Sequence, residues 1–79
     1  MNKILGYRKM ANVTQAKMAK ELGISEPTYR NKEKGKTEFT RKEIEKFANL
    51  ISGIDNTVTI EDIFFDVFPT KTDDKKEVV

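Results

Sequence analysis

The sequence of 79 residues contains no cysteine and no histidine. Without these two residue types the chain lacks a disulfide framework, a thiol nucleophile, an imidazole base and the usual ligands of a zinc site. Most enzymatic mechanisms lose their usual side chains for the same reason. We therefore predict that the protein is not an enzyme and that it needs neither a metal nor another cofactor.

Long apolar runs are also absent. The longest are only a few residues, whereas a helix that spans a bilayer needs about 20. The N-terminal stretch MNKILGYRKM lacks the apolar region and the cleavage site of a signal peptide, so we expect a cytoplasmic protein with no membrane partner. The short length also indicates one domain with one core, because a chain of this size buries only about 60% of its surface on folding.

Charge is distributed unevenly along the chain. Residues 1–46 contain 12 Lys/Arg and 6 Asp/Glu, whereas residues 47–79 contain 3 and 7, so local charges of +6 and −4 make up the net +2. This asymmetry suggests that the first part faces a polyanion and that the second part faces something else. An unevenly charged surface that is simply solvated is the alternative interpretation.

Helical periodicity and capping signals predict an all-α fold of five helices, and no run alternates in the manner of a strand. The first helix is expected at residues 3–10, where Ile4, Tyr7 and Arg8 share one side. The second begins after the N-cap Thr14 and stops at Gly23, which suits a left-handed C′ position.

The third predicted helix begins after Ser25, whose hydroxyl is expected to accept a hydrogen bond from the N–H of Thr28. Glu26 lies in the first turn, where the helix dipole favours an anion. Pro27 is tolerated there, because early N–H groups have no intrahelical partner. Gly35 ends this helix. Such a short helix is marginal in isolation, so its neighbours must hold it.

Reciprocal capping boxes mark the last two predicted helices. Thr40 and Glu43 open the fourth, and Thr59 and Asp62 open the fifth at residues 60–65. The fourth helix has the clearest amphipathic stripe in the chain. The stripe consists of Ile44, Phe47, Ala48 and Ile51.

The folded domain is predicted to span residues 1–68, because residues 69–79 are polar, charged and aperiodic and therefore predict a disordered tail. Its core is expected to be Ile4, Met18, Ala19, Leu22, Ile24, Tyr29, Ile44, Phe47, Leu50, Ile60 and Ile63. Tyr29 is interpreted as a core residue with a hydrated hydroxyl, in preference to an aromatic ring that stacks on a base.

Two short helices joined by about three residues that include a glycine form the outline of a helix-turn-helix. Residues 14–35 read TQAKMAKELGISEPTYRNKEKG. The matching elements are Thr14-Gln15, Met18-Ala19, Leu22-Gly23-Ile24-Ser25 and Glu33-Lys34-Gly35-Lys36. Together they resemble the motif of the Cro/CI-type, XRE-like family of phage-type repressors, and the resemblance covers about residues 4–65.

The resemblance implies a five-helix lambda-repressor-like domain whose second helix crosses the DNA backbone and whose third lies in the major groove. The family's base-reading positions fall on Glu26, Pro27 and Asn31, with Arg30 close by. Asn31 can pair bidentately with adenine, Glu26 can accept from the cytosine amino group, and Pro27 can contact a thymine methyl. A purely dipole-stabilising role is the alternative for Glu26.

Phosphate contacts are implied for residues beside the groove. These are Gln15, Lys17, Lys34, Lys36 and Arg41. Lys17 can equally be a solvated lysine on an exposed helix face. The resemblance also implies a partly buried ion pair between Arg8 and Glu33.

Some residues depart from the family's pattern. Several members have glutamine at the first two reading positions, where this chain has Glu26 and Pro27, so the family's operator preferences do not transfer. Lys32 replaces a residue that is usually apolar. The core at that point is therefore either slightly open or covered by the methylene stem of the lysine.

The segment IFFDVF is more apolar than one terminal helix can bury against so small a core. Exposed apolar patches usually mark interfaces, and family members often dimerise through this region. The predicted dimer interface is Phe65, Val67 and Phe68. The alternative is that these phenylalanines simply close the core.

These features predict a sequence-specific DNA-binding transcription regulator, a phage or prophage repressor of the Cro type. It would bind double-stranded DNA as a homodimer, with no small-molecule ligand, and read the operator with helix 25–34. Two alternatives remain: an antitoxin-type autoregulator with the same fold, and a protein-interaction adaptor that does not bind DNA.

Overall fold

The computed structural model describes residues 3–68, which form five helices and no strand. In chain order the helices are α1 (Lys3–Met10), α2 (Gln15–Leu22), α3 (Glu26–Glu33), α4 (Arg41–Ile54) and α5 (Ile60–Val67). The predicted all-α class is confirmed. Helix α5 continues two residues beyond its predicted end at Phe65. The tail predicted at residues 69–79 lies outside the described residues.

Capping side chains fix where the helices begin. The Ser25 hydroxyl oxygen accepts from the N–H of Thr28 at 3.2 Å, as the sequence predicts. Both predicted capping boxes are present, at the starts of α4 and α5. Gly23 ends α2 with a φ of 74°, and Gly35 follows α3 with a φ of 86°. A side chain at either position would be strained, which is why glycine occupies both.

The core contains most of the predicted residues, but not all of them. The prediction that Ile60 belongs to the core is wrong, because 36% of this residue is exposed. Ile24 and Leu50 are only partly buried. The buried apolar residues are Ile4, Ala11, Val13, Met18, Ala19, Leu22, Tyr29, Ile44, Phe47, Ala48, Ile51, Val58 and Ile63.

Val13 and Val58 are buried although they lie in loops, outside the helical periodicity. Each precedes an N-cap residue, which is the position where an apolar side chain packs against the fourth residue of the helix. Those fourth residues are Met18 and Ile63, and both are fully buried in the same cluster. A search for this staple pattern would have found both valines from the sequence.

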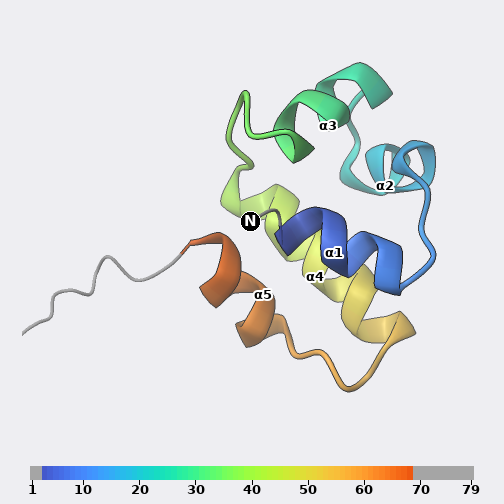
Figure 1. The fold of residues 1–79 in the computed structure, drawn as a ribbon, viewed down its shortest axis with the longest axis vertical. Helices are drawn as coiled ribbons and strands as arrows, with labels where there is room; N and C mark the ends of the chain where they lie inside the picture. The colour runs from blue at the N-terminus through green and yellow to red at the C-terminus, as the bar shows by residue number, and fades with distance from the viewer. Residues whose placement is uncertain (1–2, 69–79) are drawn as a thin grey trace, which may run out of the picture.

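Helix α4 lies in the middle of the molecule, between α2 and α3 on one side and α5 on the other (Figure 1). It packs against both α2 and α5, and α1 also packs against α5. The Tyr7 hydroxyl of α1 donates to Asp66 of α5. Burial and this carboxylate raise the pKa of Tyr7 to about 12. The arrangement places α3 and α5 at opposite ends of the molecule (Figure 1).

Candidate nucleic-acid interface

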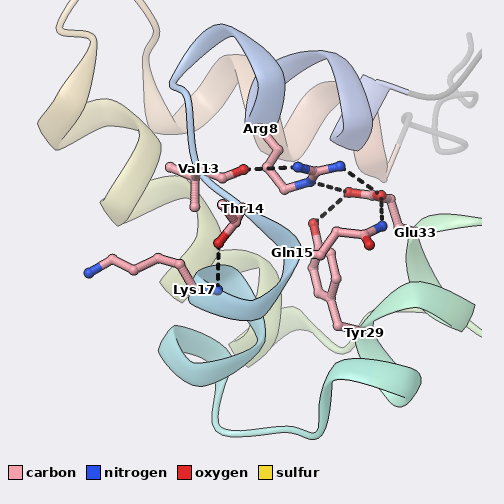
Figure 2. Close-up of polar contacts among 7 residues, drawn as sticks. All are labelled: Arg8, Val13, Thr14, Gln15, Lys17, Tyr29 and Glu33. Atoms are coloured by element: carbon pink, nitrogen blue, oxygen red, sulfur yellow. Dashed lines mark hydrogen bonds and ion pairs between the residues drawn. The ribbon is translucent and has the colours of Figure 1, made fainter.

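The inner face of α3 is held by a cluster of polar groups around the Glu33 carboxylate (Figure 2). The Arg8 Nε lies 2.7 Å from Glu33 Oε2, and Arg8 Nη2 lies 3.2 Å from Glu33 Oε1. Gln15 Nε2 and the Tyr29 hydroxyl each donate to a Glu33 oxygen at 2.8 Å. The predicted pairing of Arg8 with Glu33 is therefore present, and α1, α2 and α3 meet at this one carboxylate.

The cluster changes the titration of its members. Burial alone raises the pKa of Glu33, but hydrogen bonds from Arg8, Gln15 and Tyr29 outweigh it and leave that pKa below its ordinary value. The hydrogen bond to Glu33 raises the pKa of Arg8. Burial and the bond to Glu33 also raise the pKa of Tyr29. Ionised Glu33 and protonated Arg8 are therefore the stable forms near neutral pH.

Tyr29 was expected to have a hydrated hydroxyl, and that expectation is wrong. The residue is 0% exposed, and its hydroxyl donates to Glu33 one turn further along α3. Tyr29 and Glu33 together make the buried side of the helix. The i, i+4 spacing of a tyrosine and a glutamate on one helix face was the signal for this bond.

The four residues predicted to read bases are all exposed or partly exposed on α3. Pro27 and Asn31 are exposed and lie one turn apart on the helix surface. Glu26 and Arg30 lie beside them, also one turn apart, and form an ion pair with 2.9 Å between Arg30 Nη1 and Glu26 Oε2. Pro27 and Asn31 are thus on the side of α3 away from the core, and Glu26 and Arg30 flank that side, because Glu26 lies seven residues before the buried Glu33.

Lys32 lies on a third side of α3 and reaches toward α4. Its Nζ lies 2.9 Å from Glu43 Oε1 and 3.0 Å from the Glu38 carbonyl oxygen. Only 12% of the lysine side chain is exposed. The stem of the lysine thus covers the core. Its ammonium pairs with the Glu43 carboxylate, which also caps α4 by accepting from the N–H of Thr40. A pair separated by 11 residues leaves no periodic signal in the sequence.

The lysines predicted to contact phosphate are all exposed. Lys34 and Lys36 lie in the loop directly after α3, and Lys17 lies on α2. In Figure 2 the Lys17 side chain points away from the Glu33 cluster. These three ammonium groups are therefore available to an anion.

The two remaining phosphate candidates have partners inside the protein. The side-chain amide of Gln15 donates to Glu33, so a phosphate at this point would meet the first backbone N–H groups of α2, which lack intrahelical acceptors. The Arg41 guanidinium lies over the Phe68 ring, 5.0 Å from its centroid. Arg41 is exposed, so the N–H groups in the plane of its guanidinium stay available to a phosphate.

The predicted interface segment lies at the α5 end. Phe65 is 62% exposed, whereas Val67 and Phe68 are partly buried and pack against the core. The rings of Phe64 and Phe68 are 5.9 Å apart. Of the predicted interface residues, Phe65 is thus the one that the fold leaves open.

The pairing of α2 and α3 across the turn at Gly23, with one face of α3 locked and the other open, defines a helix-turn-helix DNA-binding domain. The helix-turn-helix family model matches residues 4–52, and the chain belongs to this family. This family is one of DNA-binding transcription regulators. No curated protein and no solved structure matches the chain. Within residues 3–68, no helix has both the length and the apolar character needed to cross a membrane.

Proposed function

We propose that this transcription regulator is a Cro-like repressor of phage or prophage type that reads operator DNA with α3. The observation that carries the proposal is the contrast between the two sides of this helix. Tyr29 and Glu33 fix the inner side in the core, while Pro27 and Asn31 project from the outer side without burial. A helix held in this way can enter the major groove without losing its support.

Each outer side chain has a chemistry that suits a base edge. The Asn31 amide can pair bidentately with adenine N6 and N7, and the Pro27 ring can contact a thymine methyl. Glu26 can accept from a cytosine amino group, and Arg30 can donate to guanine. The helix thus offers contacts to several base pairs of one half-site.

Phosphate contacts would come from both sides of the reading helix. Lys34 and Lys36 follow α3 directly, and the N-terminus of α2 presents backbone N–H groups at Gln15. Lys17 and Arg41 would add positive charge. These contacts set the position of α3 on the duplex but carry no sequence information.

A second copy of the chain would pair through the α5 end. Phe65 is a large exposed apolar residue of α5, and this helix lies at the end of the molecule opposite α3 (Figure 1). A two-fold dimer through this end would place the reading helices on half-sites about 34 to 36 Å apart. The operator is therefore expected to be an inverted repeat.

Selection of bound sites from a random duplex pool tests the proposal, followed by titration of the selected duplex at several salt concentrations. We expect enrichment of an inverted repeat, and affinity that falls as salt rises, because phosphate contacts release counterions. A chain that binds no duplex at low salt would overturn the proposal and favour the protein-interaction adaptor. Binding to every duplex without enrichment of any site would show that the protein is not a sequence-specific repressor.

A further inference from the structure

The partly exposed ion pair of α3 joins two of the side chains proposed to read DNA. Arg30 Nη1 lies 2.9 Å from Glu26 Oε2, and the two side chains are 42% and 43% exposed. The acid precedes the base by four residues, which is the favourable order on a helix. The guanidinium is therefore held along the surface of α3 while it stays accessible to solvent.

Stability is a poor explanation for this pair. Exposed ion pairs contribute little to folding, because water and salt screen them and because ordering two long side chains opposes them. Glu26 is already favoured in the first turn by the helix dipole. The main consequence of the pair is where it places the guanidinium.

An arginine without a partner has a long flexible stem and is drawn to phosphate as readily as to a base edge. The Glu26 carboxylate counteracts both tendencies in Arg30. It fixes the guanidinium against the helix that enters the groove, and its negative charge offsets the attraction of the guanidinium to the DNA backbone.

The guanidinium keeps donors for a second acceptor. It has five N–H groups in a planar fork, and the bond to Glu26 is the one hydrogen bond recorded for it among residues 3–68. Guanine presents two adjacent acceptors in the major groove, O6 and N7, which match two donors of this fork. Adenine presents an amino donor in place of O6, which would oppose the same N–H group.

We propose that Glu26 and Arg30 act as one unit that reads a G·C base pair. In this unit Arg30 donates to guanine O6 and N7, and Glu26 is a positioning residue that holds the guanidinium in the groove. The inference rests on the proposed DNA-binding function and names one base pair that the half-site must contain.

Binding of the full chain to its selected duplex and to duplexes with single base-pair changes tests the unit. Replacement of the G·C pair by A·T should weaken binding of the unaltered protein about 5- to 150-fold. A guanine analogue with carbon in place of N7 should weaken it as well, because pairing with cytosine is kept and one acceptor is lost. Arg30→Lys keeps the charge but replaces the planar fork by a single ammonium group, so it should reduce the preference for G·C over A·T.

Glu26→Gln tests the positioning role. It should reduce the preference for G·C at this one position, while the preference at the base pair read by Asn31 stays unchanged. A purely structural role of Glu26 would weaken every position alike. Glu45→Gln on α4 is the matched control, because it removes one exposed negative charge outside the reading helix. It should leave the preference at every position unchanged. Melting curves should show that all three variants are folded.

The outcomes separate this inference from the proposed function. If the unaltered protein selects sites but Arg30→Lys keeps the same preference for G·C, the proposed unit of Glu26 and Arg30 is wrong. The proposed repressor function is not affected by that result. Loss of the preference in Arg30→Lys but not in Glu26→Gln would leave Arg30 as a reader and overturn the positioning role of Glu26. The absence of any selected site would overturn the proposed function itself.

Discussion

One ion pair of α3 is buried and the other is partly exposed, but the distances within the two pairs are nearly the same. The distance is 2.7 Å in the pair of Arg8 with Glu33 and 2.9 Å in the pair of Arg30 with Glu26. The inner side chains are 10% and 5% exposed, whereas the outer ones are 42% and 43% exposed. The comparison shows that burial, and not distance, decides what such a pair does. Breaking a buried pair strands a charge away from water, but an exposed charge is simply rehydrated.

The buried pair also has more hydrogen-bond partners than the exposed pair. Glu33 also accepts from Gln15 and Tyr29, so its removal leaves several donors without an acceptor. Within residues 3–68, the side chains of Glu26 and Arg30 form a hydrogen bond only with each other. The inner pair therefore supports the helix, whereas the outer pair can keep its bond and still offer guanidinium N–H groups to DNA.

The largest expected effect is that of Glu33→Ala. Removal of the carboxylate should lower the free energy of unfolding by about 3 to 5 kcal/mol, because Arg8 is left as a stranded charge. Urea denaturation followed by circular dichroism measures this change. Glu26→Ala on the same helix is the matched control and should change the stability by only about 0.5 kcal/mol or less. Equal melting temperatures for the two variants would contradict the claim that the buried pair stabilises the fold more than the exposed pair.

The same contrast can be tested on α5, where Ile63 is buried and Phe65 is exposed. Phe65→Ser should weaken self-association by about 2 kcal/mol or more if the ring is a central contact of the dimer. Its thermal stability as a monomer should hardly change. Sedimentation at micromolar concentration, with and without DNA, measures the assembly. Ile63→Ala is the control and should instead destabilise the fold by about 2 to 5 kcal/mol. A Phe65→Ser protein that dimerises like the unaltered chain would exclude this interface.

Asn31→Ala tests whether the outer face reads sequence. It should weaken operator binding by about 1 to 3 kcal/mol and relax the preference at one base pair in each half-site. Binding to a scrambled duplex should stay nearly intact, because no phosphate contact is lost. Titrations against both duplexes measure the difference. Equal losses on the two would show that Asn31 does not read a base.

A smaller effect is expected from acid. Because the pKa of Glu33 in the folded protein lies below its ordinary 4.5, the stability contributed by the ionised carboxylate is complete above that pH. It is lost as the pH falls from there through the folded-state pKa. Unfolding experiments between neutral pH and pH ~3 should show this decline, and the decline should be shallower in Glu33→Gln. Parallel curves for the two proteins would mean that Glu33 does not contribute.

The smallest effect is expected from Lys36→Ala, which removes one exposed charge beside α3. It should weaken binding to operator and scrambled duplexes alike, and the slope of log affinity against log salt should become shallower by about one unit. Its preference among base pairs should match that of the unaltered chain. A change of preference at a single base pair would instead identify Lys36 as a reader.

Much of the local structure could be predicted from the sequence, because helix caps and turns depend on residues only a few positions apart. The capping boxes at Thr40 and Thr59 and the turn at Gly23 are present where the sequence places them. The pairing of Arg8 with Glu33 was implied only by the resemblance to a known family. Nothing in the local pattern joins two residues that are 25 positions apart.

The errors concern burial. Ile60 follows an N-cap and continues the helical pattern, but it faces out of the core. Tyr29 was placed in the core correctly, while its hydroxyl was expected in water. The exposure of one atom depends on which neighbouring helix covers it, and a pattern along one helix does not contain that information.

The sequence by itself determined the five helices, their start signals, the helix-turn-helix motif and the concentration of positive charge in the first part of the chain. Only the tertiary structure decided which ion pair of α3 is buried, that Lys32 reaches Glu43, and that Arg41 lies over Phe68. The physical reason is range. A cap or an i, i+4 pair is formed by the geometry of one helix, whereas burial and long-range pairing exist only after several helices have packed together.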